Sequence, residues 1–274
     1  MRIRYGFDIE LTLFQPTTIV TLMDVHPSRR RHVSNERPFH SSADIPVETF
    51  IDSFGNLSRR MTAEAGTLGL RLEGIVRDTG LPDEVDESAD TVALSDLPTD
   101  AIPFLMASRY CENDLLSDFA WSHFGNIAGG WAKVQAICDF VHDHLRFSYP
   151  EARETRTAAG ALEERTGVCR DFTHLAITLC RCMNIPARFC NGYLGDIGVP
   201  PDPAPMDFNA WFEAYLGGRW YTFDARHNQP RIGRILISRG RDAADVAMIT
   251  SFGPHRLGRF NVITEEVGEI TLAA

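Results

Sequence analysis

The amino-acid sequence predicts an α+β fold, in which a β-sandwich-like N-terminal domain precedes a helical subdomain packed on an antiparallel sheet. Three patterns support this prediction. Apolar and polar residues alternate in the first 80 residues, apolar residues recur at helical spacing between residues 113 and 182, and Gly217-Gly218 separates two further strand-like segments. We therefore expect a β-rich domain over residues 1–80, an acidic linker over 81–98 and the core over 99–274.

The N-terminal domain is predicted from short alternating segments. Residues 3–25 alternate apolar and polar side chains with a break at Gln15-Pro16. Residues 47–50 form another such run, followed by the turn-forming segment Asp52–Asn56. Residues 61–77 continue in the same β manner, so the region reads as strands joined by turns.

A change of composition marks the domain boundary. The segment Leu81–Asp90 contains a proline and five acidic residues. This is the composition of a solvated linker, and neither strand nor helix periodicity continues through it.

Helical spacing takes over after the linker. Residues 113–124 and 131–145 place apolar side chains three and four positions apart, which predicts two amphipathic helices. Gly167 supplies the turn into a third helix, which ends near Asn184 because Pro186 cannot continue it. The residues that this third helix directs inward are Phe172, Leu175, Leu179 and Cys182.

The doublet Gly217-Gly218 predicts a β-hairpin with a two-residue turn. Such a turn fixes the register of the two strands that it joins. The expected cross-strand pairs are Tyr215 with Trp220, Glu213 with Thr222, and Trp211 with Asp224.

This register brings three chemically interesting residues to one face. Asn209, Trp211 and Asp224 lie on the same face of the predicted hairpin. Asn209 and Asp224 are then diagonal neighbours on adjacent strands, with roughly 7–8 Å between their backbones. The last alternating segment, Arg259–Thr264, is expected to close the core sheet.

Composition restricts the partners and the location. With 274 residues, 44% of them hydrophobic, the chain can bury a substantial core. Its net charge of -10 argues against nucleic acid or an anionic membrane as a partner, because both need a positive surface. The N-terminal segment lacks the apolar block of a signal peptide, and no apolar run reaches the roughly 18 residues of a membrane span. A cytoplasmic protein is therefore expected.

The cysteines are expected to be reduced thiols, one of them reactive, rather than members of disulfide bonds. The chain has six, a number typical of reduced thiols in a protein of this size, and the Cys180-x-Cys182 pair points in diverging directions on a helix. We expect no metal and no cofactor. Cys169, by contrast, follows the Gly167 turn in the first turn of the third helix. Unpaired backbone N–H groups and the helix dipole favour a thiolate there, so a lowered pKa of this nucleophile is expected.

Several short motifs carry a family resemblance. Gly167-x-Cys169, Pro186-Ala-Arg188, Gly192-Tyr193, Asn209-Ala-Trp211 and Asp224 resemble the bacterial transglutaminase-like (papain-related) cysteine protease superfamily. The resemblance implies a papain/transglutaminase-like core in which Cys169 is the nucleophile and Asp224 the orienting carboxylate. It also implies that Asn209 occupies the position of the catalytic histidine. The turn Asp52–Asn56 resembles the β-rich N-terminal domain often found in such proteins.

The asparagine at position 209 is a departure with chemical consequences. An amide has no titratable nitrogen and cannot accept the thiol proton of Cys169. His174 lies about 140° around the helix from Cys169 and is expected to anchor the helix to the sheet. His227 could act as a substitute base if the chain bends after Asp224.

Two further residues are candidates for contact with substrate. Trp211 is expected to line the site, since it shares a face with Asn209. Arg226, which the extended ladder places opposite Asn209, could also form an ion pair with Asp224.

Three functions follow from these residues. The first is a cysteine protease or transglutaminase-like amide hydrolase or acyltransferase, which forms an acyl-enzyme at Cys169 from a peptide or protein amide. The second is a catalytically inactive binding or scaffolding protein of the same fold. The third is a reactive cysteine used in redox sensing or slow thioester exchange. The sequence does not determine the oligomeric state.

Overall fold

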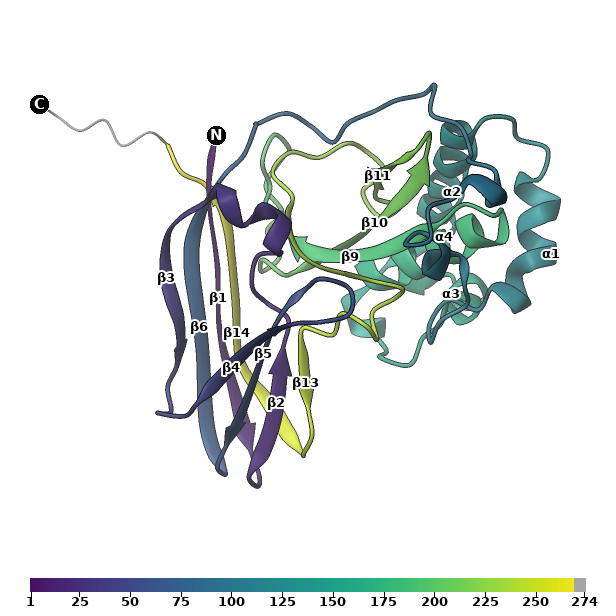
Figure 1. The fold of residues 1–274 in the computed structure, drawn as a ribbon. Helices are drawn as coiled ribbons and strands as arrows, with labels where there is room; N and C mark the ends of the chain where they lie inside the picture. Colours follow the sequence, from purple (N-terminus) through teal and green to yellow (C-terminus); the bar gives the residue numbers. More distant parts are fainter. Residues whose placement is uncertain (269–274) are drawn as a thin grey trace, which may run out of the picture.

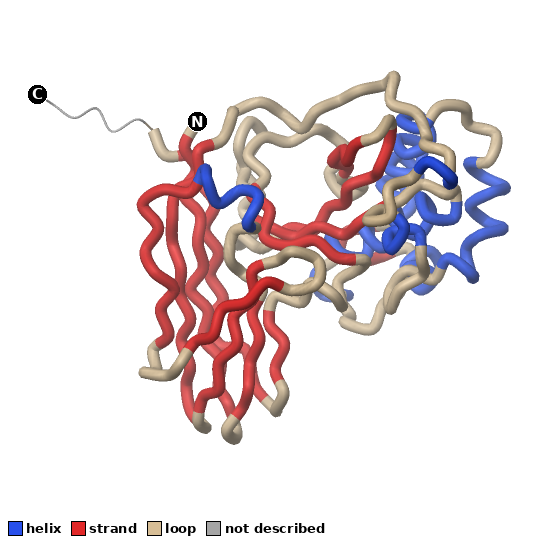
Figure 2. Tube along the Cα trace, in the orientation of Figure 1, coloured by secondary structure: helices blue, strands red, loops and turns tan. Residues whose placement is uncertain are grey.

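The computed structural model describes residues 1–268 and confirms the α+β fold class (Figures 1 and 2). Two four-stranded antiparallel sheets form a sandwich on one side of the molecule. One sheet has the order β14-β1-β6-β3 and the other β13-β2-β5-β4. Their strands are β1 (Arg2–Leu13), β2 (Thr17–Thr21), β3 (Val33–Ser41), β4 (Val47–Ile51), β5 (Leu57–Ala63), β6 (Gly66–Arg77), β13 (Ile249–Ser251) and β14 (His255–Glu266).

The core contains a third antiparallel sheet of order β11-β10-β9-β12 with helices against it. A short parallel pair, β7 (Arg146–Phe147) and β8 (Thr166–Gly167), precedes the central helix. The helices are α1 (Asn113–Phe124), α2 (Gly130–His144), α3 (Ala158–Glu164) and α4 (Cys169–Cys182), and the strands are β9 (Ala187–Tyr193), β10 (Asn209–Leu216), β11 (Arg219–Phe223) and β12 (Ile235–Gly240). Four 3-10 turns complete the elements: η1 (Pro27–His32), η2 (Leu94–Asp96), η3 (Ile102–Leu105) and η4 (Tyr149–Glu151).

The strand periodicity of the N-terminal region follows the sandwich interior. The odd-numbered residues of β1 from Ile3 to Leu13 are all buried in one apolar cluster with residues of β2, β5 and β6. The predicted break at Gln15-Pro16 separates β1 from β2, and the predicted turn Asp52–Asn56 joins β4 to β5.

Helix α4 is the central element of the core. Its residues from Asp171 to Cys182 are all buried, so it contacts neighbours on every side. One of these neighbours is the face of β10 that carries Ala210, Phe212 and Ala214. Two alanines on this face let helix and sheet pack closely, which holds the first turn of α4 against the start of β10.

The predicted helices and the hairpin register are confirmed. Helices α1, α2 and α4 coincide with the three predicted ones, whereas the short α3 was not anticipated. Gly217 and Gly218 have φ of 54° and 89°, the conformation that a two-residue hairpin turn demands. Tyr215 pairs with Trp220 and Glu213 with Thr222 as predicted. The ladder ends at the pair of Phe212 and Phe223, so the expected pair of Trp211 with Asp224 is not formed.

The expected place of the last strand is wrong. Residues 259–264 lie in β14, which pairs with β1 in the sandwich rather than closing the core sheet. Strand β13 likewise pairs with β2, so the chain returns to the N-terminal sheets after the core. Local alternation identifies a strand, but its partner depends on which sheet edge is free.

The acidic linker is largely exposed, and it is also held to the core by hydrogen bonds. It passes from the sandwich to the helical side of the core, and its carboxylates bind the core sheet and the loop after it. Asp83 accepts hydrogen bonds from the Arg231 backbone N–H at 2.9 Å and from Arg234 Nε at 2.8 Å. Asp86 accepts one from the Tyr221 hydroxyl at 2.7 Å. The acidic composition therefore serves specific pairing.

No helix in residues 1–268 is long and apolar enough to cross a membrane. Within the same range, no group of three or more His, Cys, Asp or Glu side chains is arranged to hold a metal ion. All six cysteines are free thiols.

Candidate active site

Cys169 is the first residue of α4 and faces the start of β10. The preceding residue, Val168, donates its backbone N–H to Asp171 Oδ2 at 2.8 Å, which caps the helix. Arg156 Nη1 donates to the same carboxylate oxygen at 3.2 Å. Arg156 and Asp171 are both buried, so a charge pair fixes the backbone that carries the thiol.

The pKa of this thiol differs from the sequence-based expectation. Burial raises the pKa of Cys169 to about 11, while the positive charge of Arg226 and a hydrogen bond from the Ala210 backbone N–H lower it only in part. This direction is opposite to the expected lowering, because the desolvation of the half-buried thiol between α4 and β10 outweighs the helix N-terminus. At neutral pH the sulfur carries its proton, so a nucleophilic role needs a base.

His227 lies where a base can be oriented. After Asp224 the chain turns, with the Asn228 N–H donating to the Asp224 carbonyl at 2.8 Å and Asn228 at φ 49°. This bend meets the condition set for His227 as a substitute base. His227 Nδ1–H donates to Asp224 Oδ2 at 2.8 Å, so in the neutral tautomer that makes this bond Nε2 is the nitrogen that can accept a proton.

The carboxylate that holds His227 is buried and multiply bonded. Asp224 Oδ1 accepts the backbone N–H groups of Arg226 and His227, each at 3.0 Å. Arg234 Nη2 donates to Oδ2 at 2.9 Å. Burial alone would raise the pKa of Asp224, but the charge of Arg234 and the hydrogen bonds from His227 hold it well below its usual range. The carboxylate is therefore ionised and can stabilise an imidazolium.

Asn209 and Asp224 are not bridged by a hydrogen bond; Asn209 binds Arg226 instead. Asn209 Oδ1 accepts from Arg226 Nη1 at 3.1 Å, and its Nδ2 donates to the Asp207 carbonyl at 3.2 Å. The guanidinium of Arg226 also lies 3.9 Å from the ring centroid of Phe147. The ion pair to Asp224 is made by Arg234, so Arg226 is free to lower the pKa of Cys169.

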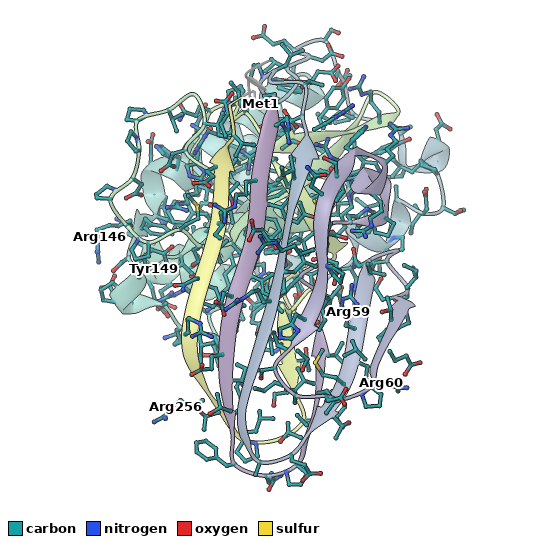
Figure 3. All side chains as sticks on the ribbon, turned by 90° about the vertical axis from the view of Figure 1, so that its left-hand side faces the viewer. Met1, Arg59, Arg60, Arg146, Tyr149 and Arg256 are labelled. Carbon is teal, nitrogen blue, oxygen red and sulfur yellow. The ribbon has the colours of Figure 1, made fainter. Side chains whose placement is uncertain are left out.

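A small cavity of about 60 Å³ lies beside these groups, and neither Cys169 nor Asp224 is part of its lining. Asn209, Arg226 and His227 line it, together with Asp207 and Tyr149. Burial and the nearby Asp207 raise the pKa of Tyr149 to about 12. Figure 3 shows Tyr149 beside Arg146 at one edge of the core, with Arg146 directed outward. The cavity is therefore bordered by a protonated phenol, an imidazole and a guanidinium.

Trp211 and His174, both considered from the sequence, do not line the small cavity. Trp211 is buried against Cys190 and Leu236 on the face of β10 opposite α4, and it does not line this cavity. Its contact with substrate stays a prediction.

His174 is buried within α4 and accepts the Ala243 N–H at Nε2, at 3.1 Å. Its Nδ1 has no acceptor among residues 1–268. Burial lowers the pKa of His174 to about 3, which fits the expected role as a neutral anchor.

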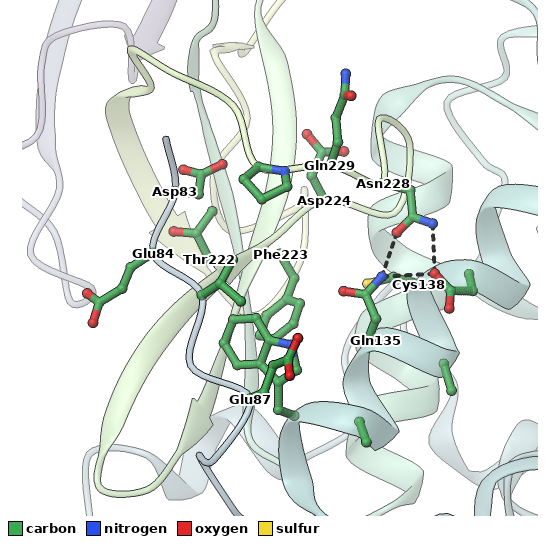
Figure 4. A pocket seen from close by; sticks show the side chains of 16 residues that line it. Asp83, Glu84, Glu87, Gln135, Cys138, Thr222, Phe223, Asp224, Asn228 and Gln229 are labelled. Atoms are coloured by element: carbon green, nitrogen blue, oxygen red, sulfur yellow. Dashed lines mark hydrogen bonds between the residues drawn. The ribbon is translucent and has the colours of Figure 1, made fainter. Parts of the chain in front are cut away.

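A larger cavity of about 590 Å³ opens on the other side of Asp224, between α2, β11 and the linker (Figure 4). Its wall contains a network in which Gln135 Nε2 donates to Asn228 Oδ1 at 2.9 Å and Asn228 Nδ2 donates to Asp139 Oδ1 at 2.8 Å. This network fixes the bend that carries His227.

Sequence reasoning missed four residues of this region: Arg234, Asp207, Tyr149 and Arg156. Asp207 stands next to the Asn209-Ala-Trp211 motif, and that position was the available signal. Arg234 and Arg156 reach their carboxylates across turns that no local period describes.

The chain is similar to known proteins in sequence and in fold. The transglutaminase-like superfamily model matches residues 125–225. The crystal structure of a candidate cysteine protease from Cytophaga hutchinsonii has a TM-score of 0.84 and 32% identity, covering 97% of this chain and 90% of that one.

Two other relatives are more limited matches. An uncharacterized protein of Mycobacterium leprae (strain TN) is 36% identical over 90 residues, which is 32% of this chain and 32% of that protein. This chain therefore matches about a third of the length of that curated relative. The periplasmic domain of TgpA from Pseudomonas aeruginosa bound to ethylmercury has a TM-score of 0.41 and 16% identity, covering 82% of this chain and 90% of that one.

Proposed function

Because the chain belongs to the transglutaminase-like superfamily, we propose that it is a cysteine-dependent amide hydrolase or acyltransferase in which His227 replaces the imidazole missing at position 209. The hydrogen bond of 2.8 Å between His227 Nδ1 and the buried Asp224 carboxylate carries the proposal. It sets the tautomer and leaves Nε2 as a proton acceptor. Nucleophile, base and orienting carboxylate are then Cys169, His227 and Asp224.

The reaction has two halves. In the first, Nε2 of His227 takes the Cys169 proton as the sulfur attacks the carbonyl carbon of a peptide or protein amide. The C–N bond breaks, the amine leaves with the proton from His227, and a thioester remains on Cys169. In the second, water or another amine loses a proton to Nε2 and attacks the thioester, which returns the thiol. Hydrolysis and transamidation differ only in this second nucleophile.

The charges near the sulfur support this assignment. The pKa of Cys169 is raised to about 11, mainly by burial, so proton removal must accompany attack. Arg226 and the Ala210 N–H favour the negative sulfur, whereas the charges of Asp207 and Asp171 oppose it. The free N–H groups in the first turn of α4 offer donors to the oxyanion that forms on the substrate.

The test is cleavage of a peptide pool, followed by mass spectrometry, with the native protein and three variants. Cys169→Ala should abolish cleavage. His227→Gln and Asp224→Asn should lower the rate by about 10²- to 10⁴-fold, the usual contribution of a positioned acid–base group. His40→Gln, which removes an exposed imidazole on β3, is the control and should leave the rate unchanged. Equal rates for native protein and His227→Gln would remove His227 from the mechanism.

A second candidate function is a catalytically silent binding or scaffolding module, favoured by Asn209 and the protonated thiol. The variant Asn209→His separates the two. If His227 is the base, the new imidazole brings little gain and breaks the Arg226 contact to Asn209. If the site has no base, Asn209→His should accelerate Cys169 alkylation, whereas His227→Gln should not slow it. A redox-sensing cysteine is disfavoured because the thiolate, not the thiol, is the reactive species.

A further inference from the structure

An arginine-rich cavity of about 230 Å³ lies behind the core sheet, on the face of β10 that carries Trp211 and Glu213. It is enclosed by η1, the linker and the segment that leads into β12. Helix α4 and Cys169 are on the opposite face of β10. Four guanidinium groups line the cavity, those of Arg29, Arg231, Arg234 and Arg239.

Each of these arginines keeps a buried N–H group without an acceptor among residues 1–268. The groups are Nε of Arg29, Arg231 and Arg239 and Nη1 of Arg234. The side chains of Arg231 and Arg234 are only 4% and 7% exposed. A buried polar group without a partner is rare, and four of them belong to the arginines that line this one cavity.

The acidic residues of the cavity are already engaged. Asp78 accepts from Arg29 at 3.0 Å, Asp83 from Arg234 at 2.8 Å and Glu213 from Arg239 at 2.9 Å. The lining itself holds four positive and three negative charges, and Arg234 is also paired with Asp224 outside it. Burial and the neighbouring charge of Arg234 lower the pKa of Arg231, a sign that like charges are crowded here.

We propose that this cavity binds a small tetrahedral oxyanion of the phosphate type. Four guanidinium groups approach from different elements, and four oxygens arranged as a tetrahedron can accept from all of them, whereas a carboxylate offers oxygens in one plane only. The cavity has room for a phosphate group with a small attached moiety. This site is separate from the proposed acyl-transfer chemistry and does not depend on it.

Arg234 connects the anion site to the candidate active site. Its Nε binds Asp83, its Nη2 binds the Asp224 carboxylate, and its buried Nη1 has no acceptor among residues 1–268. A bound anion would complete the hydrogen bonding of this guanidinium and fix its position. Since Asp224 also holds His227, occupancy of the site is linked to the orientation of the imidazole.

The test is titration of the full chain with inorganic phosphate by calorimetry, with a parallel measurement of Tm. Potassium chloride at equal ionic strength is the salt control. We expect saturable phosphate binding and a rise in Tm that chloride does not reproduce. Arg29→Gln removes a half-buried donor and should raise the Kd at least about tenfold, the effect expected for a lost charged hydrogen bond.

Arg31→Gln is the matched control, since it removes the same charge from η1 at an exposed position that does not line the cavity. It should bind phosphate like the native protein. Arg239→Gln provides a second test should Arg29→Gln fail to fold.

A phosphomonoester such as glycerol phosphate distinguishes the two sources of the anion. Tighter binding than inorganic phosphate indicates a phosphorylated metabolite, and weaker binding indicates the free ion. The proposal would be overturned if phosphate binding is not saturable. It would also be overturned if Arg29→Gln and Arg239→Gln bind phosphate as tightly as the native protein.

Discussion

The imidazole of His227 donates its Nδ1 hydrogen to the carboxylate of Asp224, three residues earlier, across 2.8 Å. The chain turns tightly between the two, so both side chains come from one loop after β11. In this protein the imidazole therefore joins its carboxylate from the same loop, while position 209 on the facing strand holds an amide. The predictions below depend on this arrangement and on the burial around it.

Removal of the imidazole should change the kinetics without changing the fold. His227 is partly exposed, with 20% of its side chain accessible, so His227→Gln should shift Tm little while the cleavage rate falls by about 10²- to 10⁴-fold. A stopped assay of peptide cleavage at pH 7 to 9 measures the rate. A loss of activity that follows a large loss of Tm would point to a structural role instead.

Alkylation of Cys169 should be slow at neutral pH. Burial raises the pKa of this thiol to about 11, so the rate of labelling by iodoacetamide should climb with pH and reach half its maximum near that value. Arg226→Gln removes the charge that favours the thiolate and should slow labelling at pH 9 by about tenfold.

Arg146→Gln is the control for this measurement, because Arg146 is exposed and pairs with Glu151. It should label like the native protein. Mass mapping identifies the modified cysteine, and the other five are buried. A midpoint below about 8.5 would instead indicate a thiolate already paired with a cation.

The cap of α4 should be a major contributor to stability. Asp171→Ala removes the acceptor of the Val168 N–H and one partner of the buried Arg156, and it should lower the free energy of unfolding by about 3 kcal/mol. Urea unfolding followed by circular dichroism measures the change. Asp143→Ala, at an exposed position of α2, should stay within about 0.5 kcal/mol of the native protein. Equal effects of the two substitutions would contradict the capping role.

Stability should fall as the pH is lowered from neutral. Burial lowers the pKa of His174 to about 3 and that of His26 to about 4. Below the ordinary histidine pKa of about 6.5 the unfolded chain binds protons that the folded protein does not. The contribution of these two neutral histidines to the free energy of unfolding is complete above about pH 6.5. It is lost as the pH falls toward 4 for His26 and toward 3 for His174.

The variant His174→Gln tests the share of this pH dependence that comes from His174. Glutamine can still accept the Ala243 N–H, but it does not titrate. Between pH 6 and 4 the free energy of unfolding should depend on pH less steeply than in the native protein, by up to about 1.4 kcal/mol per pH unit. Identical slopes for the two proteins would show that His174 binds its proton over the same pH range in the folded and the unfolded protein.

The sequence alone determined the local elements and the position of Cys169 at a helix start. Periodicity located α1, α2 and α4, the glycine doublet fixed the register of β10 and β11, and the motif around Cys169 gave its place in the first helical turn. These are properties of neighbouring residues. The asparagine at position 209 was equally visible and raised the question of the base.

Only the tertiary structure decided the partners and the charges. The pKa of Cys169 is raised because β10 buries it, Asp224 is ionised because Arg234 reaches it across a turn, and β14 completes a sheet that begins at β1. Burial and long-range charge depend on which distant elements pack together, and no local period carries that information. For the same reason the four arginines behind the core sheet were individually visible in the sequence, but their convergence on one cavity was not.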